Sequence, residues 1–186
     1  MVATAWTDFY GDASEAIPPK MPKPPGNPVN TTCFVDANHA GNLVTRRSQT
    51  GILIFVMKSP MVWYSKRQNT VETSTFGSEF VAMRQATELI LALHYKLRMF
   101  GIPIDGPTRV YGDNGAVISN SSIPTLTLTK KHNEICYHRV SEAVAAGTTA
   151  IGEVHTDYNL ADLFTEQLSP ERRYHLLQCI TYLTKR

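Results

Sequence analysis

A chain of 186 residues, of which 42% are hydrophobic, is long enough to bury one core, so we expect one compact domain with short appendages. Its 18 basic and 16 acidic residues leave a net charge of only +2, which does not indicate nucleic-acid binding by itself. Three scattered cysteines fit neither a disulfide framework nor a CxxC metal site, and no apolar run approaches the roughly 18 residues of a membrane span, so we expect an intracellular protein without membrane association.

The first thirty residues contain a proline-rich run. Residues 18–28 read PPKMPKPPGNP, and prolines can neither continue a helix nor donate hydrogen bonds within a sheet, so we interpret this run as a semi-rigid linker. The segment before it carries Trp6, Phe9 and Tyr10 and is too short to fold alone; it either docks on the main domain or ends an upstream region. The predicted divisions are a tail at 1–17, the linker at 18–30, the main domain at 31–168 and a C-terminal helix at 169–186.

Three short apolar runs follow at close spacing, which predicts an antiparallel meander of three strands. The runs are Thr32–Asp36, Gly51–Met57 and Val62–Lys66. The second is apolar throughout, so we expect it to be covered on both faces. In the third, Trp63 and Tyr64 alternate, and we expect Trp63 to lie in the core.

The hydrophobic residues then change to helical spacing. From Phe80 to Phe100 they recur every three or four residues, with Ser74 or Thr75 as a possible N-cap and Gly101 as a stop, so a long amphipathic helix carries Glu79 in its first turns. The later predicted elements are a strand at 108–112, a short helix from 113 to 118, a helix at 130–146, a strand at 149–154, a helix that contains Asp162 and is capped by Asn159, and a last helix from Ser169 to about Leu183. The order βββ-α-β-α-α-β-α, with an extra C-terminal helix, indicates an α/β domain.

Four acids stand out in this order of elements. Asp36 and Asp113 each follow an apolar strand, where α/β sheets place their ligand sites, and Glu79 and Asp162 lie on helical segments that could pack beside those strand ends. Four converging carboxylates repel one another, and divalent metals are the usual resolution. Two such ions can activate a water and stabilise the leaving oxygen in phosphodiester hydrolysis.

Seven strings of this sequence resemble, in the same order, the motifs of the ribonuclease H region at the end of copia-type retrotransposon polyproteins. They span about residues 33–168 and are Phe34–Gly41, Arg46–Gly51, Trp63–Gln68, Thr73–Ala82, Tyr111–Asn114, Lys131–His138 and Asn159–Thr165. The resemblance implies a ribonuclease H-like fold, with a mixed five-stranded sheet flanked by helices. It also implies that Asp36, Glu79, Asp113 and Asp162 are catalytic and hold two Mg²⁺ ions, for which Mn²⁺ can substitute.

The activity that the resemblance implies is endonucleolytic hydrolysis of the RNA strand of an RNA–DNA hybrid during reverse transcription, leaving a 5′-phosphate. Its partners would be the hybrid and a covalently or non-covalently associated reverse transcriptase domain, in the cytoplasm, within virus-like particles, or in the nucleus. A second hypothesis is a non-catalytic connection-like domain that binds hybrid or positions a polymerase, against which the presence of all four acids argues. A third, a DNA-directed relative such as an integrase or transposase, would need a different acid spacing.

Two positions bear on the expected site. Thr165 is followed by Glu166, where the family usually has lysine, and this removes a positive charge near the cleft. His155 lies roughly where cellular and retroviral ribonucleases H carry a mobile histidine that assists proton transfer or product release. It is either that catalytic residue or an exposed loop residue.

Basic and amide side chains near the expected site are candidates for nucleic-acid binding. Each candidate belongs either to an ordinary solvated surface or to a surface that contacts phosphates and 2′-hydroxyls of the hybrid. For the two basic pairs that flank the hairpin of the second predicted strand, Arg46–Arg47 and Lys66–Arg67, we favour binding. The candidates are Arg46, Arg47, Lys66, Arg67, Asn114, Lys130, Lys131 and His132. His39 lies three residues beyond Asp36, and its role stays open.

Overall fold

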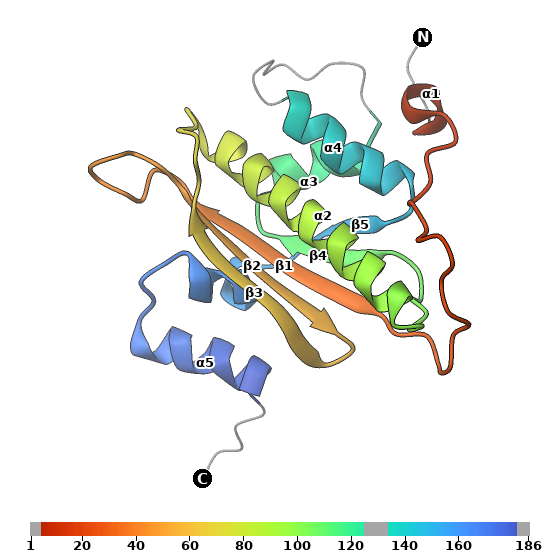
Figure 1. Cartoon of the computed structure of the whole chain (residues 1–186). Helices are drawn as coiled ribbons and strands as arrows, with labels where there is room; N and C mark the ends of the chain where they lie inside the picture. The colour runs from red at the N-terminus through yellow and green to blue at the C-terminus, as the bar shows by residue number, and fades with distance from the viewer. Residues whose placement is uncertain (1–4, 125–133, 182–186) are drawn as a thin grey trace.

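A mixed sheet of five strands organises the computed structural model, which describes residues 5–124 and 134–181 (Figure 1). The strands are β1 (Thr31–Asn38), β2 (Gln49–Val56), β3 (Ser59–Arg67), β4 (Thr108–Gly112) and β5 (Thr149–Glu153), in the spatial order β3-β2-β1-β4-β5. The first three pair antiparallel, whereas β4 pairs parallel with both β1 and β5. The predicted meander and the predicted mixed five-stranded α/β sheet are both confirmed.

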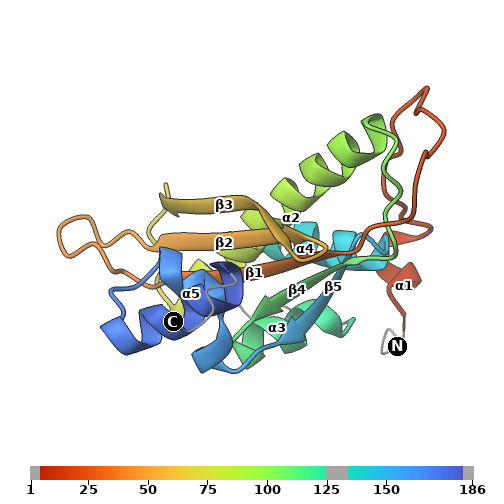
Figure 2. The ribbon, with the colours of Figure 1, turned by 90° about the horizontal axis from the view of Figure 1, so that it is seen from below.

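Helices cover both faces of the sheet (Figures 1 and 2). The α-helices are α1 (Thr7–Tyr10), α2 (Thr75–Met99), α3 (Gly115–Ser122), α4 (Glu134–Ala145) and α5 (Pro170–Thr181), and two short 3-10 helices are η2 (Thr156–Tyr158) and η3 (Leu160–Phe164). Helix α3 extends to Ser122, four residues beyond its predicted end. The predicted helix at 130–146 is described only from Glu134 onward. Within the described residues, no helix combines the length and the apolar character that crossing a membrane requires.

Side chains of β2 alternate between two hydrophobic clusters, one on each face. Ile52 and Ile54 belong to the main core under α2 and α4, while Leu53 and Phe55 pack on the other face with residues of η3 and α5 and with Leu168 between them. Because both faces are covered, the strand is apolar at every position from 52 to 56, as the sequence predicted.

Trp63 corrects the expectation that it lies in the core: it is 68% exposed, and Tyr64 packs against the core instead. Trp63 pairs with Leu53 and therefore shares the face that η3 and α5 cover. Strand β3 is an edge strand, so this cover is incomplete there, and Trp63 lines an apolar groove between the sheet and α5.

Helix α2 begins and ends as its sequence predicts. The Ser74 hydroxyl accepts a hydrogen bond from the Gly77 amide at 3.2 Å, which caps the N-terminus. After Phe100, Gly101 adopts a left-handed φ of +72° and turns the chain away. This start places Glu79 in the second turn, with its side chain buried against the sheet.

The N-terminal tail docks on the helices. The Tyr10 hydroxyl lies 2.8 Å from Nδ1 of His138 on α4. The Glu15 carboxylate lies 3.0 Å from Nδ1 of buried His94 and 2.8 Å from Nη2 of Arg98, both on α2. Residues 19–28 are exposed, so the proline-rich run adds little buried surface while the tail before it makes specific contacts.

Candidate active site

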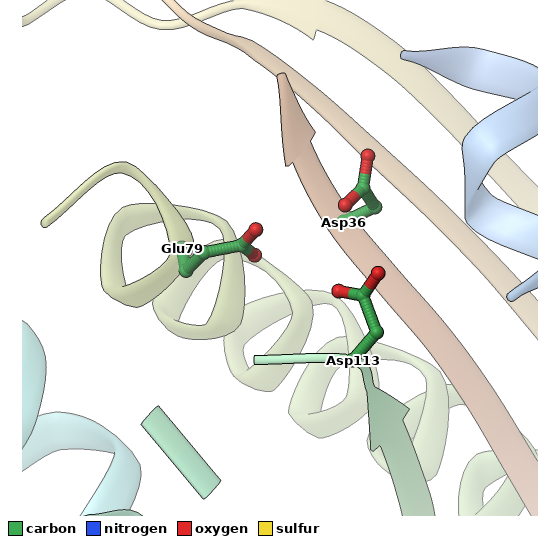
Figure 3. A group of neighbouring side chains, drawn as sticks. All are labelled: Asp36, Glu79 and Asp113. Atoms are coloured by element: carbon green, nitrogen blue, oxygen red, sulfur yellow. The ribbon is translucent and has the colours of Figure 1, made fainter. Parts of the chain in front are cut away.

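Three carboxylates from three elements meet at one edge of the sheet. Phe34 of β1 pairs with Tyr111 of β4, so Asp36 and Asp113, each two residues further on, come side by side; Asp113 directly follows β4, whereas Asp36 lies inside β1, which continues to Asn38 and does not end at the acid as the sequence suggested. Glu79 reaches the same place from α2. One oxygen from each of the three acids lies within 4.8 Å of the others, and Figure 3 shows the side chains pointing into a common space. We call these three residues the acid cluster.

Ionisation is unfavourable for two of the three carboxylates of the acid cluster, Asp36 and Glu79. Burial raises the pKa of Asp36 to about 6; repulsion from Asp113 and Glu166 adds to the rise, and a hydrogen bond from the Thr165 hydroxyl opposes it. Burial also raises the pKa of Glu79 to about 9, with further repulsion from Asp36 and Asp113. A bound cation would remove both costs, because it neutralises the carboxylates where they stand.

The segment η3 brings the fourth predicted acid, Asp162, near this cluster. Asn159 is fully buried; its Nδ2 donates to the Val35 carbonyl at 3.2 Å, and its Oδ1 caps η3 through the Ala161 amide, as the sequence predicted. Gly51 permits the approach, because a Cβ there would lie 2.7 Å from the Ala161 carbonyl oxygen. The segment therefore lies directly against β1 and β2.

The Asp162 carboxylate forms an ion pair with Arg172. It is 3% exposed and accepts a hydrogen bond from Arg172 in the first turn of α5. Burial raises the pKa of Asp162 to about 7; repulsion from Asp36 adds to the rise, and Arg172 opposes it. Among the described residues, Asp162 stands outside the group of three whose oxygens are mutually within 4.8 Å.

The acid cluster fits a hard divalent cation. All its donors are carboxylate oxygens, which suit Mg²⁺ and Mn²⁺ and not a soft metal. The cluster lines an open hollow of about 470 Å³, together with His39, Asn114 and Glu166. No Lys or Arg lines this hollow, so the described residues leave its negative charge available to a bound ion.

A larger polar groove of about 930 Å³ adjoins the hollow, and Asn38 and Glu166 line both. Its walls come from the β1–β2 loop, the end of β3 and the segment after η3. Three of the predicted nucleic-acid-binding residues, Arg47, Lys66 and Arg67, line this groove. The groove therefore presents cations beside the acid cluster, although the whole chain is nearly neutral.

The remaining predicted binding residues are placed differently. Arg46 is exposed on the β1–β2 loop with a left-handed φ of +54° and does not line the groove. Asn114 lines the acidic hollow and caps α3 by accepting from the Val117 amide at 3.3 Å. Lys130, Lys131 and His132 lie outside the described residues.

His39 lines the hollow itself, whereas His155 is connected to the acid cluster through its neighbour Thr156. Nδ1 of His39 lies 3.4 Å from the Ser78 hydroxyl. The His155 side chain is 73% exposed, with its Nδ1 3.4 Å from an Asp157 carboxylate oxygen. The residue after it, Thr156, donates its hydroxyl to Asp113 at 3.1 Å, so the loop that carries His155 touches the acid cluster.

Three side chains that contact the acids carried no distinct signal in the sequence. Thr165 donates to Asp36, Thr156 donates to Asp113, and Arg172 binds Asp162. Thr165 ends the string Asn159–Thr165, and its position three residues after Asp162 is the one available hint. The other two contacts depend on how the loop 154–158 and α5 fold back over the sheet.

No family model matches the sequence. The chain is 26% identical over 144 residues to the retrovirus-related Pol polyprotein from transposon RE2 of Arabidopsis thaliana, which covers 77% of this chain and 10% of that protein. It is 27% identical over 143 residues to the corresponding polyprotein from transposon TNT 1-94 of Nicotiana tabacum, again covering 77% of this chain and 11% of that protein. The chain thus spans about a tenth of the length of these curated relatives.

Solved structures show the fold. The N-terminal ribonuclease H domain of rv2228c from Mycobacterium tuberculosis superposes with a TM-score of 0.57 at 12% identity, covering 81% of this chain and 97% of that chain. LC11-RNase H1, solved in complex with an RNA/DNA hybrid, superposes with a TM-score of 0.54 at 16% identity, covering 73% of this chain and 94% of that chain. The predicted resemblance is confirmed: the fold is that of ribonuclease H, and the sequence relatives are retrotransposon polyproteins of the copia type.

Proposed function

We propose that this ribonuclease H domain of a retrotransposon-type polyprotein hydrolyses the RNA strand of RNA–DNA hybrids with two divalent metal ions. The observation that carries the proposal is the convergence of Asp36, Glu79 and Asp113, from three separate elements, on one point of a ribonuclease H fold. Mg²⁺ is the proposed ion, and Mn²⁺ would substitute because it has the same preference for oxygen ligands.

The acids would divide the metal binding between them. Asp36, Glu79 and Asp113 would hold one ion, and Asp162 would complete the second position beside Asp36. When bound, the two ions supply an activated water and stabilise the leaving oxygen. Thr165 and Thr156 orient the carboxylates of Asp36 and Asp113 by donating to one oxygen of each, so that the other oxygen of each would be available to a metal ion.

The groove beside the hollow would hold the hybrid. Arg47, Lys66 and Arg67 can contact phosphates, and the amides of Asn38, Asn42 and Asn69 can contact phosphate oxygens or the 2′-hydroxyls that distinguish RNA from DNA. The complex of LC11-RNase H1 with an RNA/DNA hybrid supports this choice of substrate, because that protein shares the fold. His155 would assist proton transfer or product release from its exposed loop.

The biological task we propose is removal of the RNA template during reverse transcription. The relatives are polyproteins about ten times the length of the matched segment, so a reverse transcriptase domain is the proposed partner. The cytoplasm, within virus-like particles, or the nucleus is the proposed place of action. A non-catalytic, connection-like role is the alternative, and it predicts binding of hybrid without cleavage.

A cleavage assay separates these possibilities. The purified chain is incubated with labelled RNA–DNA hybrid, duplex DNA and duplex RNA, with Mg²⁺, Mn²⁺ or a chelator. We expect metal-dependent cleavage of the hybrid alone, with 5′-phosphate ends, and loss of cleavage in Asp113→Asn but not in Asp105→Asn, which changes an exposed acid far from the hollow. Chelator-resistant cleavage, or equal cleavage of duplex DNA, would refute the proposal.

Salt dependence tests the groove in the same preparation. Each phosphate contact releases counterions, so hybrid affinity should fall steeply with salt, and Lys66→Ala should lower the slope of log affinity against log salt by about one. Lys58→Ala, at an exposed position in the turn at the other end of β3, is the matched control. If the slope of log affinity against log salt is the same in the parent and both variants, Lys66 is an ordinary solvated residue that does not contact the hybrid.

A further inference from the structure

Helix α5 directs a cation at the fourth carboxylate. The Arg172 amide is capped by the Ser169 hydroxyl at 3.3 Å, which fixes Arg172 in the first turn, and its guanidinium donates through Nη2 to Asp162. Asp162 is almost fully buried, and the Arg172 side chain is 29% exposed, so the pair is largely shielded from solvent. A pair shielded in this way interacts more strongly than an exposed one.

The same guanidinium holds the loop that carries His155. Nη2 of Arg172 also donates to the Thr156 carbonyl oxygen at 2.9 Å, and the Thr156 hydroxyl donates to Asp113 at 3.1 Å. Arg172 therefore contacts one acid directly and a second acid through one residue. Its Nε is buried without a hydrogen-bond partner among the described residues, so part of the donor capacity of the guanidinium is unused.

The Arg172 guanidinium occupies part of the space that a second metal ion at Asp162 would need. An ion at Asp162 needs a lone pair on the carboxylate that Arg172 already engages, and it would bring a double positive charge close to the guanidinium. Two positive charges about 4 Å apart in a partly buried site repel each other with an energy several times the thermal energy RT. Asp162 must therefore be shared, or Arg172 must withdraw, when both metal positions are filled.

We propose that Arg172 is a positioning residue that competes with the second metal ion for Asp162 while it fixes the Thr156 loop against Asp113. The inference rests on the proposed two-metal function. It follows that the first ion binds at the acid cluster independently of Arg172, whereas the second binds more weakly than its ligands alone would allow. A movement of α5 away from η3 would raise the affinity of the second position.

Titration of the metal-free full chain with Mn²⁺ tests this without substrate. Calorimetry at neutral pH should resolve a tighter and a weaker site in the parent. In Arg172→Ala, the weaker site should tighten by at least about five-fold, because the competing charge is gone and Asp162 has only the metal as counter-ion. Arg173→Ala removes the same charge from the next residue of α5, whose guanidinium contacts the Leu168 carbonyl, and it should change neither site.

A double-mutant cycle assigns the effect to the pair. In an Asp162→Asn background, Arg172→Ala should leave Mn²⁺ affinity unchanged, because the shared carboxylate is absent. Arg172→Lys keeps a positive charge at this position, so it should retain most of the competition for Asp162. Should Arg172→Ala fail to unfold cooperatively, Arg172→Gln removes the charge while keeping a hydrogen-bond donor, and the same tightening is expected.

The outcomes separate this inference from the proposed function. A parent that binds no Mn²⁺ overturns both. Two-site binding that is unchanged or weakened in Arg172→Ala overturns the inference alone, because Arg172 would then act as an ordinary structural partner of Asp162. The metal concentration that gives half-maximal hybrid cleavage should shift in the same direction as the weaker site, which ties the binding result to the reaction.

Discussion

Asp36 and Asp113 lie on neighbouring parallel strands, each two residues beyond the paired positions Phe34 and Tyr111. The register of β1 and β4 therefore forces two carboxylates to the same edge of the sheet, and Glu79 adds a third from α2. The free energy of folding of the metal-free protein must include their mutual repulsion. This relationship makes stability, and not only activity, a direct measure of the site.

Replacing Asp113 with Asn should stabilise the metal-free protein at neutral pH by roughly 1 kcal/mol, because it removes a charge that repels the Asp36 carboxylate. Mg²⁺ should stabilise the parent by mass action and the variant much less. Thermal melts with chelator and with Mg²⁺ give both quantities, and Asp105→Asn should behave like the parent. A variant that is less stable than the parent in chelator would place Asp113 outside a shared metal site.

The stability of the metal-free protein should fall as pH rises from about 5 to 9. The folded-state pKa values of Asp36, Asp162 and Glu79 are raised to about 6, 7 and 9, above their unfolded values near 4, so the folded state binds more protons across this window. Their stability contribution is present at low pH and is lost as each folded pKa is passed.

Denaturant titrations in chelator at several pH values measure this slope. Saturating Mg²⁺ should flatten it by holding the carboxylates ionised, and Glu79→Gln should remove its upper part, between about pH 7 and 9. A stability that stays constant over the whole range without metal would mean that the acids are well solvated.

Much of this site follows from local patterns, and the rest depends on long-range packing. The apolar run before Asp36, the helical spacing after Glu79 and the cap at Asn159 each act within a few residues, so the sequence predicts where these acids emerge. The exposure of Trp63 and the pairing of Arg172 with Asp162 depend instead on where α5 lies over the sheet. No periodicity encodes that position.

The docking of the tail is another feature that local pattern could not give. Burial alone would raise the pKa of Glu15, but hydrogen bonds from His94 and Arg98 outweigh it and lower the pKa to about 2. The stability that this carboxylate contributes is present above its ordinary pKa of about 4.5 and is lost as pH falls through about 2.

Glu15→Gln should therefore destabilise the chain by about 1–3 kcal/mol at neutral pH, with the difference shrinking in acid. Asp12→Asn, at an exposed acid of the same segment, is the control. Deletion of residues 1–28 should leave a folded, metal-binding domain with a similar loss, because residues 19–28 are exposed. Equal denaturant midpoints for the parent and Glu15→Gln would show that the tail does not dock in solution.

His155→Ala should slow multiple turnover while leaving hybrid affinity nearly unchanged, because the exposed side chain lies on the loop whose Thr156 contacts Asp113 and is not part of the groove. Comparing single-turnover and multiple-turnover rates on the same hybrid locates the effect in the bond-breaking step or in release. Unaltered rates under both conditions would make His155 an ordinary loop residue.

Glu166 lines both the acidic hollow and the larger groove beside it. Its carboxylate repels Asp36 and Asp162 and contributes to their raised pKa values. Glu166→Lys would place a cation at the junction, so hybrid affinity should rise several-fold and the salt slope should steepen by about one. The pKa of Asp36 should fall, since repulsion is replaced by attraction.

The control for Glu166→Lys is Glu171→Lys, which makes the same charge change at an exposed position of α5 that lines neither cavity. If net charge alone governed binding, both variants would tighten it equally, because they change the whole chain by the same two units. A gain confined to Glu166→Lys places the hybrid across the junction of hollow and groove, whereas equal gains or none at Glu166 would mean that the hybrid does not cross it. Fluorescence anisotropy with labelled hybrid in Ca²⁺, at several salt concentrations, measures the affinities with cleavage suppressed.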